Sequence, residues 1–180
     1  MCKRDCAPTD EEIARPMVGD DLCSDAQLVT TRSITIAATP ADVFPWIRQM
    51  GFGKAGWYSY DILDNLGRKS ATRIHPEWQN VHDGDDVPSG PISFTAIHVV
   101  EPRSFVLCFL RSQGFAHRIC FTLAYELVEQ HNQTRLVSRV RARIDAPFGS
   151  LIAKYLLGPG DGFMVRKQLR TLKERAETRL

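Results

Sequence analysis

Apolar and polar residues alternate along several segments of the chain, which is the pattern of β-strands with one buried face. The first such segment runs from Val29 to Ala37, where Ile34 and Ile36 alternate with Thr and Ser. Four more follow in succession, at residues 92–100, 105–111, 117–128 and 134–144. The links EPRS, SQG and EQHNQ between them are too short for a parallel crossover, so we expect an antiparallel meander.

The last two of these strands indicate which face of the sheet is buried. In residues 117–128 every second position is apolar, namely Ile119, Phe121, Leu123, Tyr125 and Leu127. In residues 134–144 apolar residues occupy one face and arginines the other: Leu136, Val140 and Ile144 against Arg139, Arg141 and Arg143. The sequence therefore predicts a sheet with an apolar inner face and a basic outer face.

Helical signals follow the first strand. In TPADVFPWIRQMG, Thr39 suits the N-cap and Pro40 the first helical position, and apolar residues recur at helical spacing until Gly51. Pro45 removes one backbone hydrogen bond, so this helix is expected to bend slightly. Residues 58–66 predict a second, short helix, with its apolar residues facing inward: Ile62, Leu63 and Leu66.

The end of the chain predicts a long helix. A helical start at residues 151–156 is interrupted by GPGDG, after which apolar residues recur at helical spacing: Val165, Leu169, Leu172 and Ala176. Residues 1–27, by contrast, are polar and lack periodicity. We expect them to form an extended or partly disordered arm ahead of one domain at residues 28–180.

The order strand, helix, short helix, antiparallel meander and long helix defines an α+β domain. Together with the motifs RSITIAATPADVFPWIRQMG, GWYSYDILDNLG and IHPEWQ, it resembles the SRPBCC superfamily, the START-like helix-grip proteins that include polyketide cyclase and dehydratase-like members. The resemblance covers residues 28–180. It implies a curved antiparallel sheet wrapped around the C-terminal helix, with an apolar cavity between them. It implies no particular reaction, because the superfamily includes cyclases, lipid carriers, hormone sensors and chaperone cofactors, and no catalytic motif of the superfamily is found.

The composition is that of one globular domain. The chain has 180 residues, of which 43% are hydrophobic and 24% charged, enough for one sizeable core. A net charge of +2 without a basic run argues against a nucleic-acid partner. The N-terminal residues lack the apolar core of a signal peptide, and no stretch approaches the about 18 apolar residues of a membrane span. We therefore expect a cytoplasmic protein without stable membrane insertion.

Five cysteines, an odd number without CxxC spacing, predict free thiols rather than disulfides or structural zinc. Six possible metal ligands lie close together: His75, Glu77, His82, Asp83, Asp85 and Asp86. They have neither HExxH nor EF-hand spacing, so we interpret them as a solvated acidic turn. The sequence predicts no metal and no cofactor.

The segment from Gly51 to Gln79 fits neither strand nor helix periodicity and is rich in aromatic residues. Trp57, Tyr58 and Tyr60 can close one mouth of the cavity and contact a ligand, with the tyrosine hydroxyls or Asp61 fixing its orientation. Alternatively, the same aromatic residues plug the end of the sheet and only stabilise the fold. The two interpretations are compatible, because a stabilising cap also forms a wall of the cavity.

Ionisable groups on otherwise apolar strand faces are candidates for chemistry. His98 shares a predicted face with Phe94, and His117 with Phe121, so each histidine is a candidate general acid or base in a dry site. The alternative is a strand-end histidine whose ring lies in water. With Tyr125, these four residues complete the predicted lining of the cavity, and no catalytic residue is assigned.

We therefore expect a protein that encloses a hydrophobic or amphipathic small molecule between its sheet and its C-terminal helix. An enzyme of polyketide cyclase or dehydratase type, in which a polar residue moves a proton, is the second hypothesis. A partner-binding module without a ligand is the third. The number of ionisable side chains facing the cavity separates the first two, and the oligomeric state is left open.

Overall fold

The structure is a computed structural model that describes residues 6–111, 118–146 and 158–178, with side chains from residue 162 onward in the last range. Its strands are β1 (Leu28–Ile36), β2 (Asp86–Ser89), β3 (Ile92–Val100), β4 (Ser104–Arg111), β5 (Arg118–Gln130) and β6 (Gln133–Asp145). Its helices are α1 (Asp10–Ala14), α2 (Pro40–Arg48), α3 (Asp61–Asp64) and α5 (Gly158–Glu177), with 3-10 helices η1 (Asp20–Cys23) and η2 (Pro76–Trp78).

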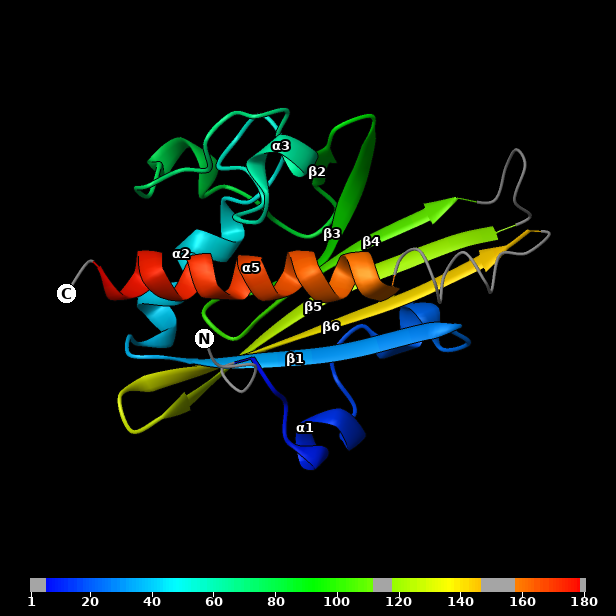
Figure 1. Ribbon diagram of the computed structural model, residues 1–180, viewed down its shortest axis with the longest axis horizontal. Helices are drawn as coiled ribbons and strands as arrows, with labels where there is room; N and C mark the ends of the chain where they lie inside the picture. Colours follow the sequence, from blue (N-terminus) through cyan, green and yellow to red (C-terminus); the bar gives the residue numbers. More distant parts are fainter. Residues whose placement is uncertain (1–5, 112–117, 147–157, 179–180) are drawn as a thin grey trace.

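The strands form one curved sheet in the order β1-β6-β5-β4-β3-β2, and every pair is antiparallel. The long helix α5 lies across the inner face of this sheet, with α2 against it (Figure 1). The predicted α+β fold, a curved antiparallel sheet around a long C-terminal helix with two short helices after the first strand, is thereby confirmed. None of the helices in the described ranges has both the length and the apolar character that a membrane span requires.

The main core lies between the inner face of the sheet and α5. Leu123, Tyr125 and Leu127 of β5 are buried in it, as the alternation along this strand predicted. The predicted stripe of α5 is buried against them: Val165, Leu169, Leu172 and Ala176. Each large apolar side chain buried in this way stabilises the fold by about 1.5–3 kcal/mol.

Some predicted elements differ in their bounds or orientation. Helix α5 begins at Gly158, so GPGDG forms its first residues instead of interrupting it, and a proline is well tolerated in a first turn. The predicted helical start at residues 151–156 lies outside the described residues. Helix α3 has only four residues, and three apolar residues predicted to face inward are exposed: Ile62, Leu63 and Leu66. The helix ends at Asp64 and Leu66 has a left-handed φ of +50°, so the continuous helical face that the spacing predicted does not form.

Residues 6–27 cover the outer face of the sheet, so the expectation of an extended or partly disordered arm is corrected over this range. Helix α1 begins with a capping box in which Thr9 and Glu12 each bind the other's main-chain nitrogen, at 3.1 and 2.8 Å. Met17 of the arm joins a small apolar cluster with Val106 and Val137 on the outer face. The arm therefore makes the outer face a second, thin core.

Arg139 of β6 is the main polar anchor of this arm and is only 3% exposed. It donates hydrogen bonds to the main-chain oxygens of Glu12 and Ile13, which lie in α1, and of Arg15, which follows the helix. Its remaining N–H groups bind the Asp20 carboxylate at 2.7 Å and a β1 threonine hydroxyl at 3.0 Å. The arginine thus satisfies carbonyl groups that a short helix leaves unpaired.

Buried thiols lie under and beside the arm. Cys6, Cys23, Cys108 and Cys120 are buried, and none of these four forms a disulfide. The Cys120 thiol donates to the main-chain oxygen of Leu22 at 3.3 Å, and burial raises the pKa of Cys23 to about 12. Burial also raises the pKa of Cys108 to about 11, so the Cys23 and Cys108 thiols stay protonated and unreactive at neutral pH.

Candidate functional site

A tight loop fixes the position of Trp57, where the candidate site begins. Gly51 and Gly56 exchange two main-chain hydrogen bonds, of 3.1 and 3.0 Å. Gly56 has a φ of +75°, and a Cβ there would lie 2.7 Å from Ser70 Oγ and 2.9 Å from Asn65 Nδ2. Only glycine suits both this left-handed conformation and this close packing.

Tyr58 lies deep in the core. It is fully buried, packs edge-on against Trp46 with ring centroids 6.1 Å apart, and its hydroxyl accepts a hydrogen bond of 2.6 Å from Gln49 Nε2. Burial raises the pKa of this hydroxyl, so the group stays protonated. Tyr58 thus occupies the position that the plug interpretation describes.

An aromatic wall formed by Trp57, Phe94, Phe109 and Phe121 lies on the inner face of β3, β4 and β5. The ring centroid of Phe94 is 5.8 Å from Trp57, 6.3 Å from Phe109 and 5.7 Å from Phe121. Farther along β4, Phe105 has no exposed surface, whereas Trp57 and Phe94 retain 7% and 8%, and the other two rings are only partly buried. This end of the inner face therefore keeps accessible apolar surface.

Gln168 of α5 connects the aromatic wall to the sheet. Its Nε2 donates to the main-chain oxygen of Trp57 at 2.9 Å, and its Oε1 accepts from the Tyr125 hydroxyl at 2.7 Å. The indole N–H of Trp57 is buried and has no hydrogen-bond partner. Ser138, which is paired with Tyr125 across β5 and β6, also has a buried hydroxyl without a hydrogen-bond partner. An unpaired buried polar group costs about 1–3 kcal/mol, so a ligand that satisfied either group would gain affinity.

Tyr60 and Asp61 lie beside the aromatic wall and hold their segment in place. Tyr60 stacks on Phe163 of α5 with ring centroids 4.2 Å apart and an angle of 2° between the ring planes. Asp61 Oδ1 accepts hydrogen bonds from the main-chain nitrogen and the hydroxyl of Ser70. Nearby, the Ser59 hydroxyl donates to the main-chain oxygen of Met164 at 3.1 Å. The contacts of Tyr60 and Ser59 fasten the aromatic segment to the C-terminal helix, and that of Asp61 closes the segment on itself.

His98 lies on the outer face of the sheet, so its predicted place beside the inward-facing residues of β3 is wrong. The pairing of β3 with β4 shifts between Ala96 and His98. Ala96 faces the main core, whereas His98 pairs with Val106 of the outer cluster. The bulge reverses the alternation of the strand, and His98 Nε2 lies 2.9 Å from Ser104 Oγ. His117, the second candidate histidine, lies outside the described residues.

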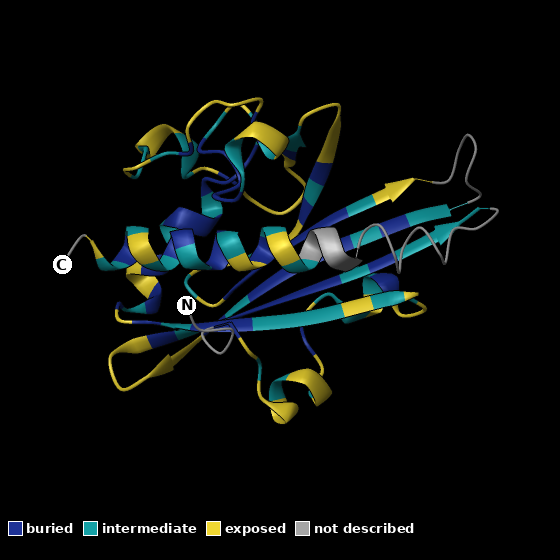
Figure 2. Ribbon diagram, in the orientation of Figure 1, coloured by how far each residue is buried: buried dark blue, intermediate teal, exposed yellow. Residues whose placement is uncertain are grey.

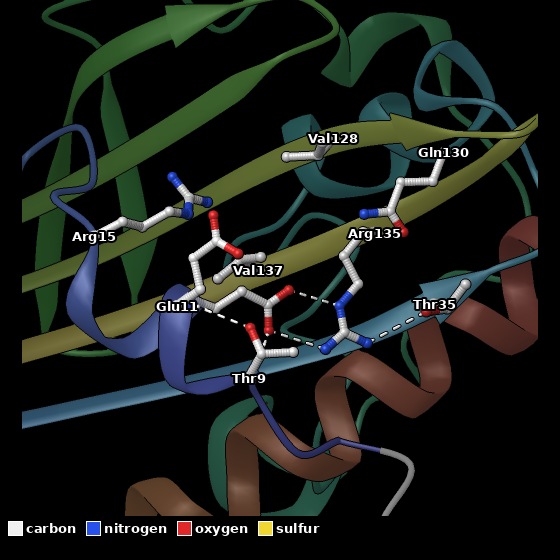
Figure 3. A pocket seen from close by; sticks show the side chains of 9 residues that line it. Thr9, Glu11, Arg15, Thr35, Val128, Gln130, Arg135 and Val137 are labelled. Atoms are coloured by element: carbon white, nitrogen blue, oxygen red, sulfur yellow. Dashed lines mark hydrogen bonds and ion pairs between the residues drawn. The ribbon is translucent and has the colours of Figure 1, made fainter.

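A hollow of about 490 Å³ lies on the outer side, where the arm meets the ends of β5 and β6 (Figure 3). Its lining consists of Thr9, Glu11, Glu12, Arg15, Thr35, Val128, Gln130, Arg135 and Val137. Both arginines form ion pairs with carboxylates: Arg135 with Glu12 at 2.7 Å, and Arg15 with Glu126 at 2.6 Å. The hollow is therefore a poorer candidate for ligand binding than the aromatic wall.

Phe109 and Gln168 belong to the site although the sequence pattern did not single them out. Phe109 continues the alternation of Phe105 and Leu107 along β4, so the strand pattern contained enough information to identify it. Gln168 interrupts the apolar stripe of α5 three residues after Val165. A polar residue on a stripe that is otherwise buried is a weaker signal, because its partners cannot be read from the sequence.

No protein-family model and no curated protein matches the chain. Among solved structures, hypothetical protein jhp0584 from Helicobacter pylori is similar, with a TM-score of 0.58 and 7% identity over 94% of this chain and 98% of its own. Protein NE0264 from Nitrosomonas europaea gives 0.53 and 12%, over 86% and 97%. The di-domain ARO/CYC BexL from the BE-7585A biosynthetic pathway gives 0.46 and 13%, over 87% of this chain and 53% of that one. The first two likenesses show a shared fold alone, and the third is too low to support an argument.

Proposed function

We propose that this protein binds a hydrophobic or amphipathic small molecule between its sheet and α5, at the aromatic wall. The observation that carries the proposal is the incomplete burial of Phe109 and Phe121, which face inward in a sheet whose other end is closed. Ligand pockets are lined by such inward-facing apolar surface with a few polar groups. Membership of the SRPBCC superfamily and a cytoplasmic location are part of the proposal, supported by the order of elements and by the buried free thiols.

The polar groups beside the wall indicate what the ligand carries. The Trp57 indole N–H is a donor without a partner, so it favours a ligand with a hydrogen-bond acceptor such as a carbonyl oxygen. Gln168 is already occupied by Trp57 and Tyr125, so it positions the wall instead of binding the ligand. We therefore propose an aromatic or aliphatic molecule with a neutral oxygen acceptor.

Proton-transfer chemistry of the polyketide cyclase or dehydratase type remains the alternative hypothesis. Among the described residues, His98 lies on the outer face, and the hydroxyls of Tyr58 and Tyr125 are hydrogen-bonded to glutamine side chains. None of these three groups is placed to move a proton at the aromatic wall. Binding without chemistry is for this reason the function we propose.

Titration with prodan, a fluorescent naphthalene ketone, tests the proposal. Prodan should bind the wild-type protein, and Trp57→Phe should weaken binding about fivefold, or about 1 kcal/mol, because the ring stays while the N–H donor is lost. Trp46→Phe is the matched control, because Trp46 also has a buried unpartnered N–H but lies in the closed part of the core.

Two results would contradict the proposal: no saturable prodan binding, or equal losses in the Trp57 and Trp46 variants. Native mass spectrometry of protein purified from its own host would then show whether a molecule of another class is retained. A retained ligand without an oxygen acceptor would overturn the role of the indole N–H while leaving small-molecule binding in place.

A further inference from the structure

The three most exposed large apolar residues in the described part of the chain lie together in and just after α3. Ile62, Leu63 and Leu66 are 81%, 67% and 79% exposed. Phe163 of α5, which is 57% exposed, stacks on Tyr60 immediately before this helix. We call Ile62, Leu63, Leu66 and Phe163 the apolar patch. Helix α3, which carries the first two of these residues, lies on the opposite side of the molecule from α1 (Figure 2). An exposed group of apolar side chains of this kind marks an interaction surface.

The main chain holds Leu66 outward in a conformation that leucine rarely adopts. Leu66 has a φ of +50°, in the left-handed region that favours glycine or asparagine. Both neighbours are fixed: Asn65 is 1% exposed and donates through Nδ2 to the Arg68 carbonyl at 2.9 Å, and the Gly67 nitrogen donates to the Asp61 carbonyl at 2.6 Å. Backbone strain of this kind is characteristic of functional segments.

Basic residues follow the apolar residues of the patch on both of its segments. Arg68 and Lys69 are exposed in the turn that follows Leu66, and Arg166 is exposed one helical turn after Phe163. Of the acidic residues in α3, Asp61 binds Ser70, and both carboxylate oxygens of Asp64 are buried away from solvent. The three basic residues outnumber these two carboxylates, so the charge beside the apolar side chains is net positive.

We infer that the apolar patch docks peripherally on an anionic lipid bilayer. Side chains exposed by two thirds or more protrude from the surface, whereas the floor of a peptide-binding groove would be largely covered. Protruding apolar residues with a basic rim fit the boundary between acyl chains and anionic headgroups. This inference is independent of the proposed ligand, since no residue of the aromatic wall belongs to the patch.

Co-sedimentation with vesicles of phosphatidylcholine and phosphatidylglycerol tests the inference. The protein should bind these vesicles and bind pure phosphatidylcholine more weakly, and added salt should reduce the difference. Leu66→Asn should weaken binding about tenfold, because an apolar side chain is lost. The same variant should unfold at a higher temperature, because asparagine tolerates the left-handed conformation. Loss of binding together with a gain of stability cannot result from misfolding.

Ile13→Ser is the matched control for Ile62→Ser. Ile13 is 53% exposed on α1, away from the patch, so only the Ile62 variant should lose vesicle binding. Lys69→Ala should weaken binding to the anionic vesicles about fivefold. The inference is overturned if the wild type does not bind anionic vesicles, or if Leu66→Asn binds as well as the wild type. It is equally overturned if sedimentation velocity shows a dimer that Leu66→Asn converts to a monomer, since the patch would then bind a second copy.

Discussion

The side-chain amide of Gln168 donates a hydrogen bond of 2.9 Å to the main-chain oxygen of Trp57 and so joins the C-terminal helix to the aromatic segment. Gln168→Leu keeps a side chain of similar size but leaves this buried carbonyl without the amide donor. We expect a loss of about 2 kcal/mol in the free energy of unfolding, measured by urea denaturation. Gln130→Leu, at an exposed position on β5, should change it by less than about 0.5 kcal/mol. Equal stabilities of the two variants would show that the bridge contributes nothing.

Two glycines of the same loop separate backbone conformation from packing. Gly53 and Gly56 have nearly equal φ values, +76° and +75°, but a Cβ at Gly53 would meet nothing within 4 Å, whereas one at Gly56 would clash with Ser70. Gly53→Ala should therefore lower the free energy of unfolding by about 1 kcal/mol, and Gly56→Ala by about 1–3 kcal/mol more. Thermal unfolding of the two variants measures the difference between their losses of stability. Equal losses would mean that the loop is not packed against residues 65–70.

Asp64 should make the protein less stable as the pH rises. Burial, with a further contribution from the Asp61 carboxylate, raises the pKa of Asp64 from 3.8 to about 6. A raised pKa means that ionisation opposes folding, so the penalty is absent below about pH 4 and complete above about pH 6. Asp64→Asn should leave stability near pH 4 unchanged and increase it by about 1 kcal/mol at pH 7, a value reduced for partial exposure.

Urea denaturation across this pH range checks the Asp64 prediction. Asp86→Asn, at an exposed position in β2, is the control and should not alter the pH profile. A gain in stability that is the same at pH 4 and pH 7 would point to improved packing instead of a removed charge.

Glu12 should have the opposite pH dependence. The hydrogen bond from Arg135 lowers the pKa of Glu12 from 4.5 to about 2, with Thr9 and Ser33 adding to the effect. A lowered pKa stabilises the fold above the ordinary value, and this contribution is lost as the pH falls towards 2. Glu12→Gln should destabilise the protein by about 1–2 kcal/mol at pH 7, and the deficit should shrink below about pH 4.

The neighbouring Glu11 provides the control for Glu12. It is exposed on the same helix, so Glu11→Gln should have little effect on the free energy of unfolding at any pH. A deficit in the Glu12 variant that does not change between pH 7 and pH 3 would rule out its ion pair with Arg135 as the cause.

The sheet could be predicted from the sequence because its central strands have one face in a single core. The alternation of Phe121, Leu123 and Tyr125 predicted the buried face of β5 correctly. The same reasoning failed at His98, because one extra residue in a bulge reverses the faces without changing the composition of the strand. Strand β2 was missed because it has only four residues, one of them proline.

The candidate site was predictable only in part, because its geometry depends on contacts between distant segments. Trp57 and Phe94 were identified from their residue types, and the structure places their rings together. The hydrogen bond from Gln168 to Trp57 joins residues more than a hundred positions apart, and no local sequence pattern predicts it. The arginines of β6 were correctly assigned to the outer face, but their partners lie in a polar arm without periodicity.

The arm also has a consequence for the order in which the chain matures on the ribosome. Arg139 is translated 119 positions after Asp20, the residue whose carboxylate it binds. The segment that covers the outer face therefore emerges long before β6, and its main polar anchor is absent until that strand has been made. During synthesis the arm remains accessible to other binding partners and to proteases. The arm is thus synthesised first but is among the last segments to adopt its final position.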